Sequence, residues 1–455
     1  MDVKQIVSEQ KKFFDQKGTR DIEYRIRNLE KLRDAIKRYE PDIVNAIKKD
    51  LNKSEFDTYL TEIGFVLSEI KHTIKHLRRW AKPERVGTSK LLLGSKSTIY
   101  KEPYGVTLII SPWNYPFQLL ISPLVGAIAA GNCIIMKPSE FTPHVSQCIG
   151  QMIEGIFDPH YITVIEGDAE VSQAIMKEPI DHIFFTGSVP VGRIIMAEAA
   201  KTLTPLVLEL GGKSPAIVEC DANLKLTAKR LVWGKFVNAG QTCVAPDYLL
   251  VHERVKDELL VLMKEAIIEF YGDKPLENEN YTHIVNERHF DRLAKLLEGE
   301  NEFYWGGDKN REALSIEPTI IDGVDWKHIT MEDEIFGPIL PVLTFNDLDK
   351  AVAEVKQLPK PLALYIFSED RRKQQFILES VPYGGGCIND TLIHLATPHL
   401  PFGGIGPSGM GAYHGKFSFD AFTHQKGIVK QTTRFDVPVR YPSFKDGLKW
   451  LKKLL

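Results

Sequence analysis

A cysteine that follows a Gly-Gln-Thr turn is the residue of this sequence best suited to nucleophilic chemistry. Cys243 closes the stretch GKFVNAGQTC, residues 234–243, at the end of an apolar segment. A thiol there can attack an electrophilic carbon once a modest fall in its pKa provides thiolate near neutral pH. Unpaired cysteines, however, are more often buried and inert. By itself the stretch leaves two interpretations open, an attacking nucleophile and a packed small side chain.

Two other residues could assist a thiol nucleophile. Asn114 lies in the loop SPWNYP, residues 111–116, where two prolines restrict the backbone. An asparagine amide on such a loop can donate to a developing oxyanion, although asparagine in a loop is usually a turn residue. Glu209 lies within an apolar run, where burial raises the pKa of an unpaired carboxyl. We expect it to be either a general base or a member of a buried ion pair.

Three stretches could bind a nucleotide. Residues 184–192 place Gly187, Ser188 and Gly192 between an expected strand and an expected helix, where free N–H groups suit a pyrophosphate. Their spacing departs from the dinucleotide fingerprint GxGxxG. Residues 404–409 match that fingerprint, but no strand precedes them and no βαβ unit follows, so we reject them. Lys137 and Glu140 follow an expected strand directly, where they could hold a ribose or simply form a surface turn.

The composition excludes several other classes of function. The net charge of −3 and the pI near 6.5 give no sign of a nucleic-acid partner. The acidic cluster at 331–334 has no histidine at ligand spacing, so no metal site is predicted. An odd number of widely spaced cysteines argues against a disulfide framework, and the polar N-terminus has no signal core. No apolar run reaches the ~18 residues of a membrane span, and we expect a cytoplasmic protein.

The elements that must position these residues alternate in a regular way. Residues 1 to about 80 read as amphipathic helices, with Pro41 at the start of a second helix and a third from Phe56 to Trp80. From Tyr104 onwards, short apolar strands alternate with helices as far as Phe367. This pattern predicts an α/β protein with two doubly wound parallel sheets, each covered by helices on both faces. Ligands of such sheets bind beyond the carboxyl ends of the strands.

The chain is expected to divide into two domains, an arm and a tail. Residues 1–82 and 102–211 would form a dinucleotide-binding domain, and residues 212–410 a catalytic domain that carries Cys243. Residues 83–101 and 411–441 read as extended, notably from Phe417 onwards, and we expect them to pair as an arm. The basic amphipathic tail, 442–455, could lie on a membrane surface, but we expect its apolar side to pack on the protein body.

Taken together, the motifs resemble the aldehyde dehydrogenase superfamily, and most closely its short class 3 branch. They occur in the order typical of that family and span nearly the whole chain. The matching stretches are Ser-Pro-Trp-Asn-Tyr-Pro at 111–116, Lys-Pro-Ser-Glu at 137–140, Phe-Thr-Gly-Ser at 185–188, Leu-Glu-Leu-Gly-Gly-Lys at 208–213, Gly-Gln-Thr-Cys at 240–243, Glu-Ile-Phe-Gly-Pro at 334–338 and Pro-Phe-Gly-Gly at 401–404.

This resemblance implies NAD(P)-dependent oxidation of aldehydes to carboxylic acids. Cys243 would attack the aldehyde, the Asn114 amide and the Cys243 backbone N–H would hold the oxyanion, and Glu209 would activate the water that hydrolyses the thioester. Residues implied to bind the cofactor are Trp113, Lys137, Glu140, Gly187, Ser188, Gly192, Leu210, Glu334 and Phe336. Residues expected to meet a medium- or long-chain aliphatic or aromatic aldehyde are Tyr115, Trp233 and Thr242.

The resemblance also has implications for the cofactor and for assembly. Glu140 would favour NAD by repelling a 2′-phosphate, while Lys137 would allow NADP as well. The arm would form a bridging sheet in a homodimer, and the chain lacks the long apolar C-terminal tail of the membrane-bound relatives. Two alternatives remain: a coenzyme A-acylating dehydrogenase, against which Glu209 counts, and a non-catalytic protein of the same fold. A Cys-His thiol hydrolase would leave the nucleotide motifs unexplained.

Overall fold

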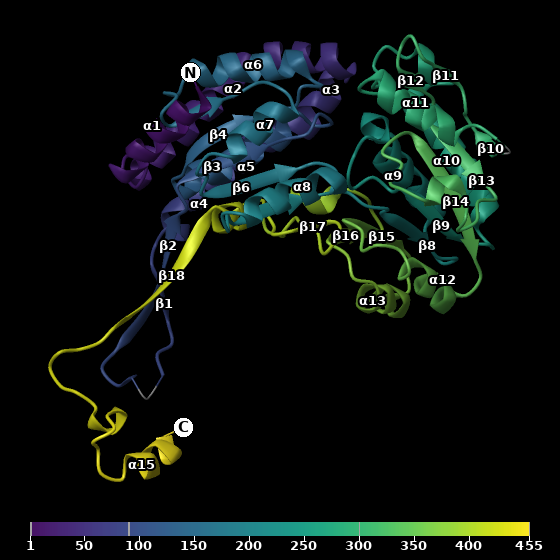
Figure 1. Ribbon diagram of the computed structural model, residues 1–455. Helices are drawn as coiled ribbons and strands as arrows, with labels where there is room; N and C mark the ends of the chain where they lie inside the picture. The colour runs from purple at the N-terminus through teal and green to yellow at the C-terminus, as the bar shows by residue number, and fades with distance from the viewer. Residues whose placement is uncertain (1, 90–91, 300, 455) are drawn as a thin grey trace.

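The computed structural model describes residues 2–89, 92–299 and 301–454. Its N-terminal part is a layer of helices that packs on the helices of the first sheet (Figure 1). The layer comprises α1 (Val3–Asp15), α2 (Ile22–Leu51), α3 (Glu55–Thr58), the π-helical turn η1 (Tyr59–Ile63) and α4 (Gly64–Trp80). No helix among the described residues has an apolar stretch long enough to cross a membrane.

The expectation that Pro41 begins a new helix is wrong, because α2 runs through it without a break. Proline removes one backbone donor and normally bends or ends a helix. Here Ile36, Ile43 and Ile47 lie on one fully buried stripe on either side of the proline. Burial of that continuous stripe outweighs the lost hydrogen bond, since each fully buried isoleucine contributes roughly 1.5–3 kcal/mol.

The first sheet has six strands in the order β17-β7-β6-β3-β4-β5. All neighbours are parallel except the short edge strand β17. The strands are β3 (Val106–Ile110), β4 (Cys133–Lys137), β5 (Ile162–Val164), β6 (His182–Thr186), β7 (Leu206–Glu209) and β17 (Gly409–Met410). The helices between them are α5 (Gln118–Ala130), α6 (Pro143–Glu154), α7 (Ala169–Met176) and α8 (Val189–Ala200). The order in which strands are added to the sheet reverses between β3 and β6, and such a switch point is where ligands of open α/β sheets bind.

The second sheet has seven strands in the order β10-β13-β14-β9-β8-β15-β16. It is parallel except for β10 at one edge. The strands are β8 (Pro215–Val218), β9 (Tyr248–His252), β10 (Glu302–Trp305), β13 (Thr319–Asp322), β14 (Ile339–Phe345), β15 (Ala363–Phe367) and β16 (Gly385–Ile388). Its helices are α9 (Leu224–Phe236), α10 (Lys256–Tyr271), α11 (Glu287–Leu296), α12 (Leu348–Val355) and α13 (Arg371–Ser380). The two sheets confirm the predicted doubly wound α/β class.

Several shorter elements complete the molecule. A two-stranded ladder pairs β11 (Lys309–Asn310) with β12 (Ser315–Ile316). Short 3₁₀ turns are η3 (Val237–Gly240), η4 (Pro275–Glu277), η5 (Ile329–Met331), η6 (Ile393–Ala396) and η7 (Pro438–Arg440). Of these, η3 leads directly to Cys243 and matters most for the site.

A third sheet, of three antiparallel strands, projects from the body as an arm (Figure 1). It orders β1 (Glu84–Val86), β2 (Lys96–Pro103) and β18 (Thr423–Lys430) side by side, with β18 paired to β2 along its whole length. The two extended segments, far apart in the sequence, therefore do meet. The backbone ladder joins the two segments, and Lys426 also forms an ion pair with Glu102 across them at 2.6 Å.

Two expectations about the C-terminal part are wrong. Residues from Phe417 are not extended at first, because α14 (Lys416–Ala421) forms a helix that packs against α5 and α4. Phe419 and Phe422 are completely buried in that contact, which explains why the chain stays on the body before entering the arm. The tail does not pack on the body either: α15 (Gly447–Leu454) lies at the far end of the arm, beside η7 (Figure 1).

Candidate active site

The loop that carries Cys243 has an unusual backbone. Directly after α9, three successive residues adopt left-handed conformations: Asn238 with φ 56°, Ala239 with φ 51° and Gly240 with φ 69°. Such conformations are strained for residues other than glycine and occur mostly at functional sites. A Cβ on Gly240 would lie 2.2 Å from the Gly337 carbonyl oxygen, so the loop passes very close to that backbone. The turn ends the helix abruptly and presents Cys243 beyond it.

Gln241 holds this loop in place. Its side chain is completely buried, and the amide nitrogen donates to the carbonyl oxygens of Asn238 at 3.1 Å and His283 at 2.9 Å. Its amide oxygen accepts from the backbone N–H of Val285 at 3.1 Å. The glutamine of the Gly-Gln-Thr-Cys stretch is therefore a cross-link between two loops, and it lines none of the cavities described below.

The surroundings of Cys243 keep its resting thiol protonated at neutral pH. Burial raises the pKa of the Cys243 thiol to about 12, and the nearby carboxyl groups of Glu334 and Glu209 act in the same direction. The backbone N–H groups of Cys243 and Val244 have the opposite, smaller effect on that pKa. Positive charge beside the sulfur would therefore be needed to favour the thiolate.

Glu209 is the last residue of β7 and has no partner among the described residues. Its side chain is almost fully buried, and neither carboxylate oxygen is hydrogen-bonded. Burial raises the pKa of Glu209 well above its usual value. Of the two interpretations that the sequence left open, the structure therefore removes the buried ion pair.

Asn114 is buried in a loop that interlocks with the Cys243 loop. Its side-chain amide nitrogen donates to the Gln241 backbone carbonyl oxygen at 3.0 Å, and its backbone carbonyl oxygen accepts from the Asn238 side-chain amide at 2.9 Å. Next to it, the hydroxyl of Tyr115 is hydrogen-bonded to that of Thr242 at 2.7 Å. These contacts across more than a hundred residues bring Asn114 to the loop of Cys243.

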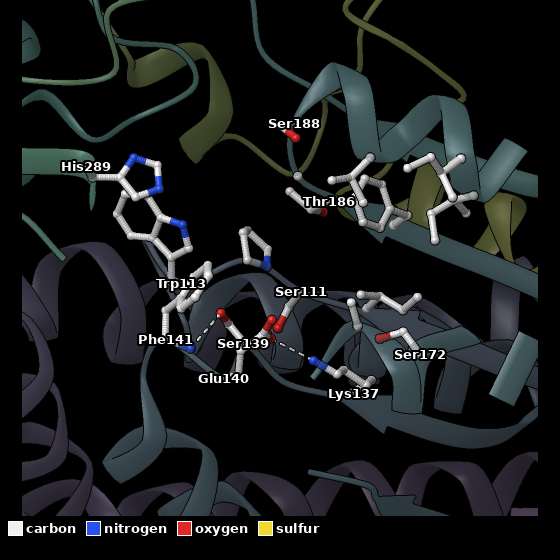
Figure 2. A pocket seen from close by; sticks show the side chains of 18 of the residues that line it. Ser111, Trp113, Lys137, Ser139, Glu140, Phe141, Ser172, Thr186, Ser188 and His289 are labelled. Carbon is white, nitrogen blue, oxygen red and sulfur yellow. Dashed lines mark hydrogen bonds and ion pairs between the residues drawn. The ribbon is translucent and has the colours of Figure 1, made fainter. Parts of the chain in front are cut away.

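A large cavity opens beyond the carboxyl ends of β3, β4 and β6 (Figure 2). It has a volume of about 1020 Å³, and Lys137, Glu140 and Trp113 are in its wall together with Gly187 and Ser188. Lys137 Nζ lies 2.8 Å from Glu140 Oε2, so these two residues form an ion pair rather than an open turn. Size and position suit a dinucleotide at the switch point of the sheet.

An adjoining cavity of about 730 Å³ continues from the first one towards Cys243. It shares Trp113, Gly187 and Ser188 with the first cavity and adds the other expected residues Asn114, Glu209, Leu210, Cys243, Glu334 and Phe336. We call the two together the cofactor cavity. Gly192 is in neither wall: it packs beneath Leu210, whose Cδ2 atom would lie 2.6 Å from a Cβ at that glycine.

The inner part of the cofactor cavity is closely shaped. The Glu334 carboxylate lies against Gly211, where a Cβ would come within 2.0 Å of Oε2, and burial raises the pKa of Glu334 to about 8. Phe336 has a left-handed backbone with φ 50° and meets Trp113 edge-on, with ring centroids 5.4 Å apart. A carboxyl group and an aromatic corner at this place fit the ribose and the ring of a nicotinamide nucleotide.

Sequence reasoning missed two basic residues of the cofactor cavity. Arg288 and Arg292, from α11, are in the wall of both parts, and Arg292 also donates to the Ile335 carbonyl oxygen at 2.7 Å. Guanidinium groups suit phosphate oxygens. Because they are four residues apart, both lie on one face of the helix. This spacing would have indicated a paired basic site only if a helix had been predicted at α11.

A third cavity, of about 230 Å³, is mainly apolar, and we call it the apolar cavity. All three residues expected to meet the substrate, Tyr115, Trp233 and Thr242, are in its wall. The apolar and cofactor cavities meet at five shared residues: Leu119, Thr186, Glu209, Leu210 and Cys243. The thiol and the unpaired carboxyl thus face both cavities.

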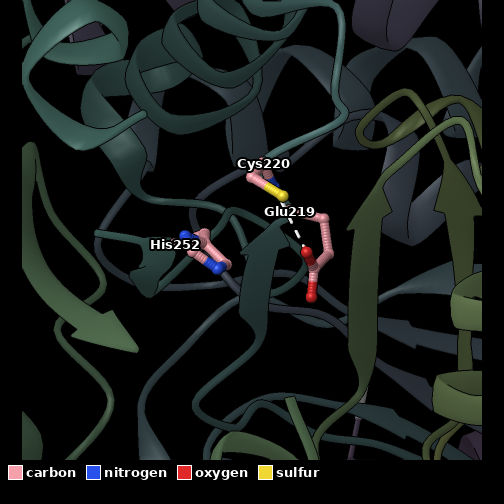
Figure 3. Close-up of side chains that lie close together, drawn as sticks. All are labelled: Glu219, Cys220 and His252. Carbon is pink, nitrogen blue, oxygen red and sulfur yellow. Dashed lines mark hydrogen bonds between the residues drawn. The ribbon is translucent and has the colours of Figure 1, made fainter. Parts of the chain in front are cut away.

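A possible metal site elsewhere is better explained as an ion-pair cluster. Glu219, Cys220 and His252 place potential ligand atoms within 4.8 Å of one another (Figure 3). The ammonium of Lys373 lies 2.6 Å from Glu219 Oε2 and 3.9 Å from the Cys220 sulfur. Because a positively charged side chain already neutralises the carboxylate, the group has no need of a metal ion.

Comparison with known proteins agrees with this architecture. The model of the aldehyde dehydrogenase family matches residues 1–428, and the chain belongs to that family. It is 49% identical over 451 residues to 4,4'-diaponeurosporen-aldehyde dehydrogenase of Staphylococcus aureus, covering 99% of this chain and 98% of that protein. It is 44% identical to aldehyde dehydrogenase family 3 member H1 of Arabidopsis thaliana, covering 99% of this chain and 94% of that protein.

Other relatives bear on the cofactor. A mouse aldehyde dehydrogenase described as dimeric and NADP-preferring is 40% identical, covering 97% of each chain. The substrate-bound structure of the Staphylococcus aureus enzyme AldH superposes with a TM-score of 0.96 at 49% identity, covering 99% of this chain and 98% of that one. An indole-3-acetaldehyde dehydrogenase in complex with NAD+ superposes with a TM-score of 0.86 at 25% identity, covering 95% of this chain and 89% of that one. The protein is an NAD(P)-dependent dehydrogenase that oxidises aldehydes to carboxylic acids.

Proposed function

We propose that Cys243, Asn114 and Glu209 carry out the chemistry of this oxidation. The observation that carries the proposal is the position of Cys243 and Glu209 at the junction of the cofactor and apolar cavities. An aldehyde in the apolar cavity would reach the thiol from one side, while the cofactor would reach it from the other. Of the two residues, the Cys243 thiol is the nucleophile, so the covalent intermediate would form there.

The residues divide the reaction into two steps. The Cys243 thiol gives its proton to water, and its sulfur adds to the aldehyde carbon. The resulting oxyanion accepts hydrogen bonds from the Asn114 amide and the Cys243 backbone N–H. When bound, the nicotinamide supplies the hydride acceptor and a positive charge beside the thiol. Loss of hydride leaves a thioester on Cys243. Glu209, ionised, then takes a proton from the water that releases the carboxylic acid.

For the cofactor, we assign Lys137 and Glu140 to the adenosine ribose and Glu334 to the nicotinamide ribose. Ser188 and Gly187, at the N-terminus of α8, would face the pyrophosphate. Glu140 would disfavour a 2′-phosphate, but its ion pair with Lys137 offsets part of that charge. NAD is therefore the expected preferred cofactor, with NADP also accepted. Comparing kcat/KM for both cofactors in wild type and Glu140→Gln tests this, because a strong wild-type preference for NADP would contradict it.

For the substrate, the apolar lining supports medium- or long-chain aliphatic or aromatic aldehydes. The related Staphylococcus aureus enzyme is named 4,4'-diaponeurosporen-aldehyde dehydrogenase. Each additional CH₂ buried in the cavity should raise kcat/KM by up to about fourfold, since burial contributes ~0.8 kcal/mol per methylene. A series of straight-chain aldehydes measures this, and a flat profile would contradict an apolar substrate site.

The proposed chemistry is tested by the absorbance of NADH formed in the absence of coenzyme A. Wild-type enzyme should turn over, whereas Cys243→Ala should lose at least about 10³-fold in kcat because the covalent route is closed. Cys220→Ala is the matched control, since that thiol lies outside all the described cavities that hold the site. A requirement for coenzyme A would favour the acylating alternative, and turnover by Cys243→Ala would refute the mechanism.

Assembly and location follow the same resemblance. We propose a homodimer joined through the arm, because a three-stranded sheet that leaves the body exposes apolar side chains such as Ile428 and Val429. A cytoplasmic location agrees with the five cysteines, all of which are free thiols.

A further inference from the structure

A completely buried ion pair contacts the loop of Asn114. Lys53 Nζ is 2.6 Å from Glu62 Oε1, and the two side chains are 1% and 0% exposed. An ion pair so deeply buried is weak evidence for stability, because the loss of hydration offsets most of the attraction. The function of the pair is therefore to be sought in the contacts that Lys53 and Glu62 make with other residues.

Glu62 anchors the start of α5. Its second carboxylate oxygen accepts from the backbone N–H groups of Phe117 at 2.9 Å and Gln118 at 3.3 Å. These are the first N–H groups of the helix, and Phe117 at the N-cap has no side-chain oxygen to bind them. A carboxylate at this place satisfies free donors and interacts favourably with the helix dipole. Glu62 thus caps the start of α5, which begins four residues after Asn114.

Lys53 contacts the other end of the same segment. Its ammonium lies 3.5 Å from the Asn114 carbonyl oxygen and 4.2 Å from the ring centroid of Tyr115. The first contact is a long hydrogen bond and the second a cation–π interaction. Since Tyr115 is itself hydrogen-bonded to Thr242, the ammonium supports a loop that contacts the residue next to Cys243.

The turn that carries Glu62 also forms part of the apolar cavity. Glu62 belongs to η1, a π-helical turn in which Leu60 and Thr61 line that cavity. Turns of this kind hold one extra residue and are frequent at functional sites. Gly64 makes the turn possible, because a Cβ there would lie 2.9 Å from the Tyr59 carbonyl oxygen. One turn therefore supplies both a wall for the substrate and the anchor for α5.

We propose that Lys53 and Glu62 are positioning residues that together hold the Asn114 amide where the oxyanion forms. The pair secures both ends of the segment from Asn114 to Gln118, which no other ion pair among the described residues contacts. This inference rests on the proposed role of Asn114 and extends it to two residues outside every cavity wall of the site.

The test compares hydride transfer with thiol reactivity in Lys53→Met and Glu62→Gln. The single-turnover rate of NADH formation, per folded enzyme, should fall about 10- to 100-fold, since small displacements of an oxyanion donor are costly. Alkylation of Cys243 by iodoacetamide develops no oxyanion, so its rate should stay within about twofold of wild type. Loss of both rates in parallel would overturn the proposal, because it would indicate general disruption of the site.

Two further variants separate positioning from stability. Lys373→Met removes another ion pair to a buried carboxylate, that of Glu219, far from Asn114 in the chain. It should lower the melting temperature and leave the NADH rate per folded enzyme unchanged. The double variant Lys53→Met/Glu62→Gln removes both charges, so it should regain melting temperature relative to the single variants but not the NADH rate. A folded double variant with the wild-type rate would overturn the proposal.

Asn114→Ala distinguishes failure of this inference from failure of the proposed mechanism. If Asn114→Ala keeps the wild-type NADH rate, the role of Asn114 is wrong and the inference falls with it. If Asn114→Ala is slow but Lys53→Met is not, only the inference is wrong. If both the mechanism and the inference are correct, adding Lys53→Met to Asn114→Ala should lower the NADH rate little further. The two substitutions would then remove the same interaction with the oxyanion.

Discussion

An unpaired buried carboxyl is costly, and Glu209 bears that cost at the end of β7. The same burial that raises its pKa makes it a stronger base once it is ionised, because a higher pKa means a greater affinity for the proton of water. At the residue scale, the site therefore combines a thiol and a carboxyl whose pKa values are both raised by burial. Activity then depends on how much of each is ionised when the reactants are bound.

Glu209→Gln should separate the two halves of the reaction. We expect a burst of about one NADH per active site followed by turnover slowed ~10²- to 10⁴-fold, since only thioester hydrolysis needs the base. In wild type, kcat should rise with pH as Glu209 ionises above its usual range. Stopped-flow absorbance measures the NADH burst and the pH dependence of kcat. In Glu209→Gln, kcat should no longer rise with pH. Absence of a burst in the variant would contradict the assignment.

The same substitution should change stability in a direction that depends on pH. Between the ordinary pKa of a glutamate and the raised pKa of Glu209, the folded protein binds more protons than the unfolded chain. The free energy of unfolding therefore falls as pH rises through that window. Glu209→Gln has no carboxyl to titrate there, so its stability should not show this decrease. The variant should melt at a higher temperature than wild type at pH 8, by roughly 2 °C per kcal/mol regained, with a smaller difference at pH 5. Calorimetry at both values measures it, and an inverse trend would contradict the raised pKa.

At the scale of elements, the backbone turn before Cys243 is the feature most sensitive to substitution. Gly240→Ala adds a Cβ to a left-handed residue and places it 2.2 Å from the Gly337 carbonyl oxygen. We expect a destabilisation of about 1–3 kcal/mol and a loss of kcat as Cys243 moves. Melting temperature and NADH formation report the two effects.

Gly272→Ala provides the matched control for that prediction. Gly272 also has a positive φ, 84°, but nothing lies within 4 Å of a Cβ there. It carries the conformational strain without the collision and lies at the end of α10, outside the site. If Gly240→Ala and Gly272→Ala lose equally little activity, close approach to Gly337 is not what positions Cys243.

The strands and the site motifs could be predicted from the sequence because each is a local signal. Short apolar runs between turns indicated the inner strands of both sheets, and β3, β4 and β6 confirmed them. The strands that were missed, such as β10 and β16, are half exposed and contain glycine or polar residues. The prediction of a helix start at Pro41 was wrong because proline is a local signal. The burial that keeps α2 continuous comes from packing on other helices, which the local sequence does not show.

The contacts that support the site could not be predicted from the sequence. Lys53 and Asn114 are 61 positions apart, and no spacing in the sequence relates them. Asn114 and Gln241 are 127 apart, yet one bonds the other. Only a family resemblance placed Asn114, Glu209 and Cys243 together before the structure did. Pairs with large separations in the chain depend on the fold as a whole, so residue types alone could not identify them.

At the scale of the molecule, the proposed homodimer would be joined through the arm. Val429→Asp puts a charge on an exposed apolar position of β18, and we expect it to shift the homodimer towards monomer at micromolar concentration. Sedimentation velocity across a dilution series measures this. Val261→Asp, an equally exposed valine on α10, is the control and should leave the distribution unchanged. A monomeric wild type would contradict the proposed dimer.

The order in which the chain completes its first sheet has a consequence for synthesis. The edge of β7 is covered by β17, which comes about two hundred residues later, and α5 is covered by α14, which comes nearly three hundred residues later. Asn132, beside α5, also donates to the Phe422 carbonyl oxygen at 3.0 Å. On the ribosome, the nucleotide-binding half must therefore wait with an open strand edge and uncovered apolar surface until residue 422 has emerged. Chaperone demand and aggregation should be greatest in that interval, and a chain stopped before β17 should be insoluble.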